Sequence, residues 1–393
     1  MNTKPSRPLP VGGLVLFRQG FRPFFLAGGL WGFVSVALWL AMLNGAAAIS
    51  TGFGLAAWHA HEMIFGYTGA VIAGFLLTAI PNWTGRLPLR GLPLALLFTT
   101  WLVGRVVMAI SIHMPPILVA VLDLLFLAAL FLVVLREIVA GRNWRNLPMP
   151  IALAGLLLAN GLTHLEAVGR AQTGLVGQRL GIAIIVMLIG LVGGRIIPSF
   201  TRNWLAKRAE TRMPTGFGRF DHVCLLITLV ALGGWVVSPD SRSVGAALLV
   251  AGFAGFARLA RWRGHRTLSE PLVWSLHLGF AWVPVGLGLL GLGAFFPELF
   301  PTTAGLHALT VGAIASMTLA VMTRATLGHS GRPLTADRCT TAIYTLIATA
   351  AAARVAAPIA VDGYDPLLWA SGLLWSAAFG LFTVHYGRML LAR

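Results

Sequence analysis

Apolar runs of about 20 residues, separated by short polar connectors, recur along the whole chain. An α-helix rises about 1.5 Å per residue, so a run of this length crosses the roughly 30 Å of hydrocarbon in a bilayer. A helix also satisfies its backbone hydrogen bonds internally, as lipid requires. The pattern therefore predicts an all-α bundle of about twelve spanning helices, at residues 24–44, 58–80, 92–113, 116–140, 147–167, 178–198, 221–238, 243–262, 271–296, 304–326, 339–360 and 366–388.

The connectors leave no room for a separate soluble domain. The longest of them, the Arg-rich stretch 201–221, divides the chain into possible halves, 1–200 and 221–393. We therefore expect one integral membrane domain over residues 1–393. A weaker repeat of about 124 residues, visible where Arg or Glu precedes Pro at the start of the first, fifth and ninth helices, suggests three four-helix units instead. Chance similarity among helices rich in Ala, Gly and Leu explains that repeat more simply.

The composition is typical of a membrane protein and excludes an ordinary soluble domain. Hydrophobic residues make up 57% of the chain and charged residues 10%, whereas a soluble domain carries about 25% charged residues to face water. The two cysteines, Cys224 and Cys339, form no CxxC pattern, so neither a disulfide framework nor a thiolate metal site is indicated. The segment 24–44 is too long for the apolar core of a cleaved signal peptide, and we expect it to be a retained helix.

The net charge of +17 arises from basic residues in the connectors. With the N-terminus inside, the twelve spans place 24 of the 29 Lys and Arg residues at the cytoplasmic face and four at the outer face. Lys and Arg concentrate in this way in the cytoplasmic loops of membrane proteins. We therefore expect a multi-pass protein in contact with lipid, with both termini cytoplasmic. Nucleic acid is not an expected partner.

The second predicted helix opens with the densest polar motif, Trp58-His59-Ala60-His61-Glu62-Met63. An ionisable group inside a bilayer costs about 3 kcal/mol or more, so it needs a partner. At about 100° per residue, His59, Glu62 and Met63 share one helix face, whereas His61 points elsewhere. The two histidines therefore serve different centres, or the first turn is unwound. Imidazole beside a thioether suits copper, and imidazole alone suits haem iron; interfacial hydrogen bonding is the plainer alternative.

Three further polar residues fall at the same outer depth. His164 and Glu166 end the fifth helix, and His307 opens the tenth. Metal ligands are neighbours in space rather than in sequence. The predicted metal ligands of this outer layer are His59, His61, Met63, His164 and His307. Glu62 and Glu166 are candidate catalytic residues, as proton carriers on the same side.

A second, sparser layer of polar residues lies toward the cytoplasm. His277 is about two turns into the ninth helix, too deep to reach the interface, and is the best candidate for an axial haem ligand. His329 follows the tenth helix, where an interfacial role also explains it. Arg105 lies inside the third helix and has Asp123 of the fourth as a possible ion-pair partner. Alternatively, the Arg105 guanidinium holds a haem propionate, because guanidinium binds carboxylate bidentately.

Four sequence blocks are distinctive: Phe21-Arg22-Pro23-Phe24-Phe25, the block from Trp58 to Gly66, Gly193-Gly194-Arg195-Ile196-Ile197-Pro198, and the run from His307 through Met322-Thr323-Arg324-Ala325 to Pro333. They resemble the NnrS family, and the likeness covers essentially the whole chain. That family is known as haem- and copper-containing proteins of the bacterial cytoplasmic (inner) membrane, linked to denitrification and nitric oxide tolerance. The resemblance implies haem and copper as cofactors. The histidines inside matching blocks are His59, His61, His307 and His329; His164 and His277 join the candidate haem ligands by their depth.

The leading hypothesis is a haem- and copper-binding membrane protein that protects against nitric oxide and nitrosative stress. The haem is expected to be of the b type, because the chain has no CxxCH attachment motif. One alternative is a nitric oxide reductase-type enzyme fed by quinol or another electron donor. A second is a metal or haem transporter, suggested by the twelve spans and by Pro284 inside the ninth helix. No Walker A, HExxH or GxSxG motif supports hydrolase chemistry.

Overall fold

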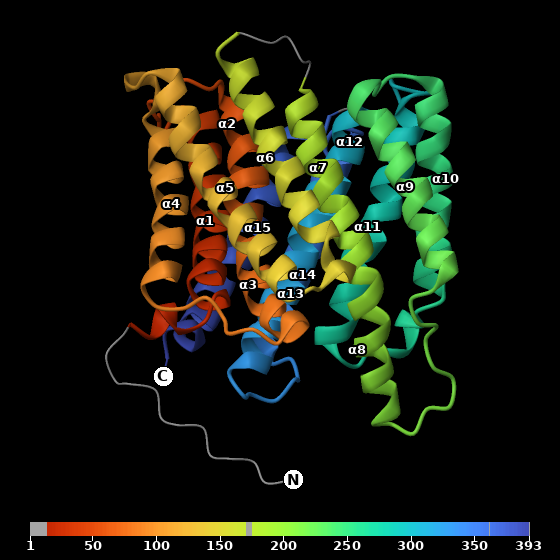
Figure 1. The fold of residues 1–393 in the computed structure, drawn as a ribbon. Helices are drawn as coiled ribbons and strands as arrows, with labels where there is room; N and C mark the ends of the chain where they lie inside the picture. The colour runs from red at the N-terminus through yellow and green to blue at the C-terminus, as the bar shows by residue number, and fades with distance from the viewer. Residues whose placement is uncertain (1–13, 170–174, 361, 393) are drawn as a thin grey trace.

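The computed structural model describes residues 14–169, 175–360 and 362–392, and over these residues the chain is helical, with no strand. Twelve helical stretches in this described part are long and apolar enough to cross a membrane (Figure 1). The prediction of an all-α protein with twelve spans is confirmed. Most observed ends lie within a few residues of the predicted ones; the largest difference is the sixth span, which continues to Ala206.

The spans are built from fifteen α-helices and short π or 3₁₀ segments of the described chain. The first six spans are α1 (Phe21–Leu43), α2–η2–α3 (Leu55–His61, Glu62–Tyr67, Thr68–Thr84), α4 (Leu92–Ala109), α5 (Pro116–Ala140), η4–α6 (Trp144–Asn146, Pro148–Ala167) and α7–η5–α8 (Val176–Leu188, Ile189–Gly193, Gly194–Ala206). The last six are α9 (Arg219–Val237), α10 with η6 (Arg242–Ala260, Gly264–Arg266), α11 (Pro271–Gly293), α12–η7–α13 (Thr302–His307, Ala308–Ala315, Ser316–His329), α14 (Arg338–Ala356) and α15 (Tyr364–Leu391). The 3₁₀ turns η1 (Val15–Arg18) and η3 (Ser111–His113) lie in connectors.

The second, sixth and tenth spans share two features. Each is 28 to 31 residues long, and each contains a π-helical segment: η2, η5 or η7. They are also among the four most buried of the twelve spans. A π turn inserts one residue into an α-helix and is frequent at functional sites. These three spans, which we call the central spans, are spaced four spans apart along the chain.

The two ends of the described chain meet at one face of the bundle. The guanidinium of Arg22 donates hydrogen bonds to the backbone carbonyls of Leu390 and Ala392, at 2.8 and 2.7 Å. The neighbouring spans α1 and α15 pack closely because glycine removes the side chain between them: a Cβ at Gly32 would lie 2.7 Å from the ring of Phe379. We call this face the inner end and the opposite face the outer end.

Three cavities follow one another between the central spans. The outer cavity, of about 120 Å³, and the middle cavity, of about 90 Å³, are both lined by Thr68. The middle cavity shares Phe75, Val192 and Val321 with the inner cavity, which has a volume of about 570 Å³. Nearly all the side chains around the middle cavity are apolar. The bundle therefore contains an axial series of spaces, with an apolar section between two more polar ones.

The orientation expected from the basic residues is testable with single cysteines. In a protein carrying Cys224→Ala and Cys339→Ala, Thr211→Cys lies in an exposed inner connector and Ser238→Cys in an exposed outer one. We expect a membrane-impermeant maleimide to label Ser238→Cys in intact cells, and Thr211→Cys only after the membrane is permeabilised. The reverse labelling pattern would show that the positive-inside orientation is wrong.

Candidate functional site

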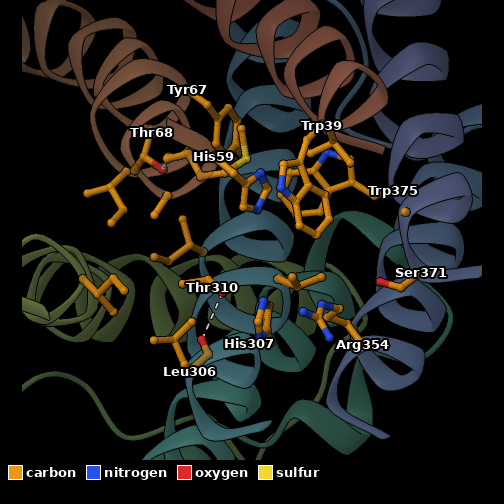
Figure 2. A pocket seen from close by; sticks show the side chains of 18 of the residues that line it. Trp39, His59, Tyr67, Thr68, Leu306, His307, Thr310, Arg354, Ser371 and Trp375 are labelled. Atoms are coloured by element: carbon orange, nitrogen blue, oxygen red, sulfur yellow. Dashed lines mark hydrogen bonds between the residues drawn. The ribbon is translucent and has the colours of Figure 1, made fainter. Parts of the chain in front are cut away.

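The outer cavity brings together two histidines from different central spans. His59 is on α2 and His307 is the last residue of α12, and Figure 2 shows both side chains directed into the same space. Met63, one helical turn after His59, lines the cavity from the same face of its helix. The prediction that His59 and Met63 share a face, and that His307 lies at their depth, is thus reproduced by the cavity lining. The donors gathered here are imidazole nitrogen and thioether sulfur.

Each of the two cavity histidines has one ring nitrogen without a hydrogen bond to the described residues. The Nδ1 atom of His307 lies 2.7 Å from the carbonyl oxygen of Thr303. Because a carbonyl only accepts, Nδ1 donates the hydrogen and Nε2 of a neutral His307 keeps its lone pair. His59 stacks on Trp39 with the ring centroids 4.3 Å apart, and its buried Nδ1 atom has no hydrogen-bond partner in the part of the chain that the structure describes. Ligating histidines in proteins commonly donate their second N–H to a carbonyl in this way.

The outer cavity also contains a buried cation that the sequence did not single out. Arg354 of α14 lines the cavity beside His307 (Figure 2). Its Nη1 atom is buried and has no hydrogen-bond partner among the described residues. In the sequence, Arg354 is simply an arginine near the outer end of an Ala-rich helix, and only the packing of α14 against η7 and α12 places it at this site.

A separate, closed network of charged groups lies beside the outer cavity. Arg105 of α4 donates to Oε2 of Glu62 at 2.6 Å and also to Asp123 of α5. The indole N–H of Trp31 on α1 donates to the same Glu62 oxygen at 2.7 Å. All three charged side chains are nearly fully buried. The predicted ion pair between Arg105 and Asp123 is confirmed, and Glu62 is a second carboxylate partner.

His61 connects the two carboxylates of this network. Its Nδ1 atom lies 3.1 Å from Oε1 of Glu62, and its Nε2 atom lies 3.0 Å from Oδ2 of Asp123. Carboxylates only accept, so this arrangement suits an imidazolium that donates from both nitrogens. One imidazolium and one guanidinium then balance two carboxylates, leaving the buried network neutral.

The network continues into α6 through Asn160 and His164. Asn160 donates from Nδ2 to Oδ2 of Asp123 at 2.7 Å, and the Nε2 atom of His164 lies 3.0 Å from the same oxygen. The sequence analysis did not identify Asn160 as part of a site, because its only signal there is that an asparagine lies in an apolar helix. Glycine allows the close approach on the other side, because a Cβ at Gly66 would lie 2.6 Å from Nη1 of Arg105.

Within the described part of the chain, these residues also form one group that could hold a metal ion, provided that His61 is deprotonated and no longer donates to Asp123. His61, Asp123 and His164 each offer a ligand atom, and these three atoms all lie within 4.8 Å of one another. Two imidazoles with a carboxylate are a donor set that Zn²⁺ and Fe²⁺ accept. The two histidines of the motif therefore serve different places, as their helical spacing predicts: His59 lines the outer cavity and His61 lies in the buried network. The five predicted metal ligands of the outer layer therefore do not converge on one point; they are His59, His61, Met63, His164 and His307.

The inner-layer histidines also lie in two places. His277 of α11 does not line the axial cavities; its Nε2 atom lies 2.8 Å from the hydroxyl of Thr201, and its Nδ1 atom is buried with no partner among the described residues. It lines a lateral pocket of about 620 Å³ together with Phe256 and Leu268, both of which are exposed. His329 lines the inner cavity and is exposed at its mouth. Both assignments as haem ligands stay predictions.

The two candidate acids are not neighbours. Glu62 is part of the buried network, whereas Glu166 is half-buried near the outer end of α6 and accepts a hydrogen bond from the backbone N–H of Leu175 at 3.0 Å. Arg105 has its guanidinium engaged by two carboxylates and lines none of the cavities described above. Its role in holding a cofactor, like the roles of both acids, stays a prediction.

The buried network should be essential for stability. Removing one partner of a buried ion pair leaves an uncompensated charge, at a cost of about 3 to 5 kcal/mol. We therefore expect Arg105→Ala to lower the free energy of unfolding by about that amount, measured by thermal or denaturant unfolding in detergent. Arg86→Ala, which breaks an exposed pair with Glu137 at 2.5 Å, is the matched control and should cost about 1 kcal/mol or less. Equal effects of the two substitutions would contradict a stabilising role.

Comparison with known proteins agrees with the sequence blocks that line these sites. The family model described as NnrS protein matches residues 15–393, nearly the whole chain. A comparison with curated proteins gives no match. The matched region includes every residue of the outer cavity and of the buried network, and it shows that this twelve-span chain belongs to the NnrS family.

Proposed function

We propose that this protein binds copper and haem in the bacterial cytoplasmic membrane and protects the cell from nitric oxide. The observation that carries the proposal is the outer cavity, where His59 and His307 from two central spans face one space with Met63. The free ring nitrogens and the thioether form a donor set that suits copper, and Cu(I) in particular. Family membership supports a role related to nitric oxide.

The cavity volumes support different locations for the two proposed cofactors. Pockets for drug-sized molecules have volumes of about 300 to 1,000 Å³, so the outer cavity of about 120 Å³ fits a metal ion with a small ligand and not a porphyrin. The inner cavity, of about 570 Å³, and the lateral pocket, of about 620 Å³, are both in the range for a porphyrin. His329 and His277, respectively, are the imidazoles available there. A bound haem would supply iron that coordinates nitric oxide.

The route to the outer cavity suits a small uncharged molecule. Nitric oxide dissolves in lipid, so it reaches a membrane-embedded site without a water-filled channel. The middle cavity adjoins the outer one at Thr68 and is lined by apolar side chains such as Ile189 and Met317. Ions are strongly disfavoured in such a section because nothing replaces their hydration. The axial cavities therefore favour a neutral ligand over an ion as the species that moves between the two ends.

Copper binding is tested by metal analysis of purified full-length protein. We expect His59→Ala and His307→Ala to weaken copper binding at least about tenfold, since even outer-shell changes around a metal cost that much. His113→Ala is the matched control, because His113 is exposed in a connector at the same end of the bundle. Wild-type protein without copper, or equal loss in all three variants, would overturn the outer-cavity assignment.

A nitric oxide reductase fed by quinol is the second candidate, and the lateral pocket favours it. The pocket places the buried imidazole of His277 beside exposed apolar residues of α10 and α11, a location open to a lipid-soluble donor. If the protein is a reductase, anaerobic solutions with reduced quinol should lose nitric oxide catalytically, and His277→Ala should raise KM for quinol more than it lowers kcat. If the protein binds nitric oxide but does not turn it over, the protective function remains supported and the reductase function is excluded.

A further inference from the structure

The inner cavity contains two arginines that face a space without carboxylates. Arg195 of α8 and Arg324 of α13 line it from two central spans, together with the amide side chains of Asn82, Asn146 and Asn203. No Asp or Glu is among its lining residues in the described part of the chain. The cavity therefore combines two positively charged side chains and three amides with aromatic and aliphatic lining residues.

Neither arginine has an acidic partner within 4.0 Å among the described residues. The Nε atom of Arg195 is buried without a hydrogen-bond partner, and its Nη1 atom makes only a long contact of 3.5 Å with Oδ1 of Asn146. The guanidinium of Arg324 lies 4.0 Å from the ring centroid of Phe200, a contact that leaves its N–H groups available. The donor capacity of both side chains is largely unused.

The preference of membrane proteins for cytoplasmic arginines explains why Arg195 and Arg324 lie toward the inner end, but not why both line one cavity without an acidic residue among its described lining. Two of the buried guanidinium groups have carboxylate partners: Arg105 has Glu62 and Asp123, and Arg258 has Asp221 at 3.0 Å. Arg22 instead donates to backbone carbonyls, and Arg354 of the outer cavity keeps a buried Nη1 atom without a partner among the described residues. A buried charge without a partner is costly. Arg195 and Arg324 are half-buried and share one cavity, and the Nε atom of Arg195 is buried without a partner among the described residues. Together these observations point to a partner that the described chain does not supply.

The mouth of the inner cavity is positively charged, as is the cavity itself. An adjoining pocket of about 410 Å³ shares His329 with the inner cavity and is lined by four arginines, Arg18, Arg22, Arg90 and Arg332, with no acidic residue among its described lining. A concave surface of one sign focuses the field and raises the local concentration of the opposite ion. Anions are thus attracted toward the inner cavity from the face where the chain ends meet.

We propose that the inner cavity binds a carboxylate or another small oxyanion between Arg195 and Arg324. Guanidinium matches a carboxylate or phosphate with two parallel hydrogen bonds. The amide of Asn203 also lines the cavity and is a further donor. Two sources carry this chemistry: a propionate of a bound haem, which rests on the proposed function, or a free oxyanion that enters from the mouth. The site is independent of copper binding in the outer cavity.

The free-anion source is tested on full-length protein in nanodiscs of phosphatidylcholine, which contain no anionic lipid. Acetate and inorganic phosphate are titrated at constant ionic strength, and binding is followed by calorimetry and by the shift in melting temperature. We expect Arg195→Gln and Arg324→Gln each to weaken binding about tenfold or more, the effect of losing a charge-assisted hydrogen bond. Arg212→Gln, which removes one positive charge from an exposed inner connector, is the matched control and should bind like wild type.

The haem source is tested on the same variants as purified, by haem stoichiometry and by the position of the Soret band. If a propionate occupies the site, Arg195→Gln and Arg324→Gln lower haem content or shift the band, and Arg212→Gln does neither. Arg195→Lys and Arg324→Lys keep the charge and are expected to restore folding and only part of the binding, because lysine cannot form the bidentate pair.

An effect specific to the two cavity arginines in either arm supports the proposal and identifies the source. If Arg212→Gln had the same effect as the two cavity substitutions, the binding would be due to general surface charge and the proposal would be wrong. So would wild-type protein that binds neither probe and whose haem content does not depend on Arg195 or Arg324. Copper content measured on the same samples reports separately on the outer cavity, so failure of one proposal is distinguishable from failure of the other.

Discussion

The buried contact of Arg105 with Glu62 and Asp123 is the constraint on which this part of the bundle depends. Through Trp31, His61, Asn160 and His164, the same network joins α1, η2, α4, α5 and α6, the first five spans. In lipid, a charge without its partner costs more than most packing defects. The partners must therefore be delivered to one point, which fixes the depth and rotation of each helix relative to the others.

That network and the outer cavity use opposite sides of one short segment. The helix α2 directs His59 toward α12 and α14, whereas His61 is directed toward α5 and α6. The π turn η2 begins immediately after His61, at Glu62. Gly66 lets the Arg105 guanidinium approach the backbone of this turn, and Trp101 donates to the Gly66 carbonyl at 2.9 Å. The side of the segment with the ion-paired network thus supports the side whose histidines keep free nitrogens.

The axial cavities differ in what their arginines touch. Arg354 in the outer cavity and Arg195 in the inner cavity each retain a buried N–H group without a partner among the described residues. The apolar middle cavity lies between these two cavities. Anionic groups therefore have a favourable site near either end and a barrier between the ends. This division is consistent with the proposed oxyanion site at the inner end of the bundle and with the proposal that a small neutral ligand moves between the ends.

The amino-acid sequence by itself determined the twelve spans, because apolar length and backbone hydrogen bonding in lipid are local properties. It also determined that His59 and His61 face different ways, since the helical angle between them is fixed by their spacing, and it suggested Asp123 as the partner of Arg105. The convergence of His59 with His307, and of Arg195 with Arg324, required tertiary structure. These residues lie far apart in the chain, and only the packing of the three central spans brings them around shared cavities. Asn160 and Arg354 were missed for the same reason: their meaning depends on which helix lies opposite.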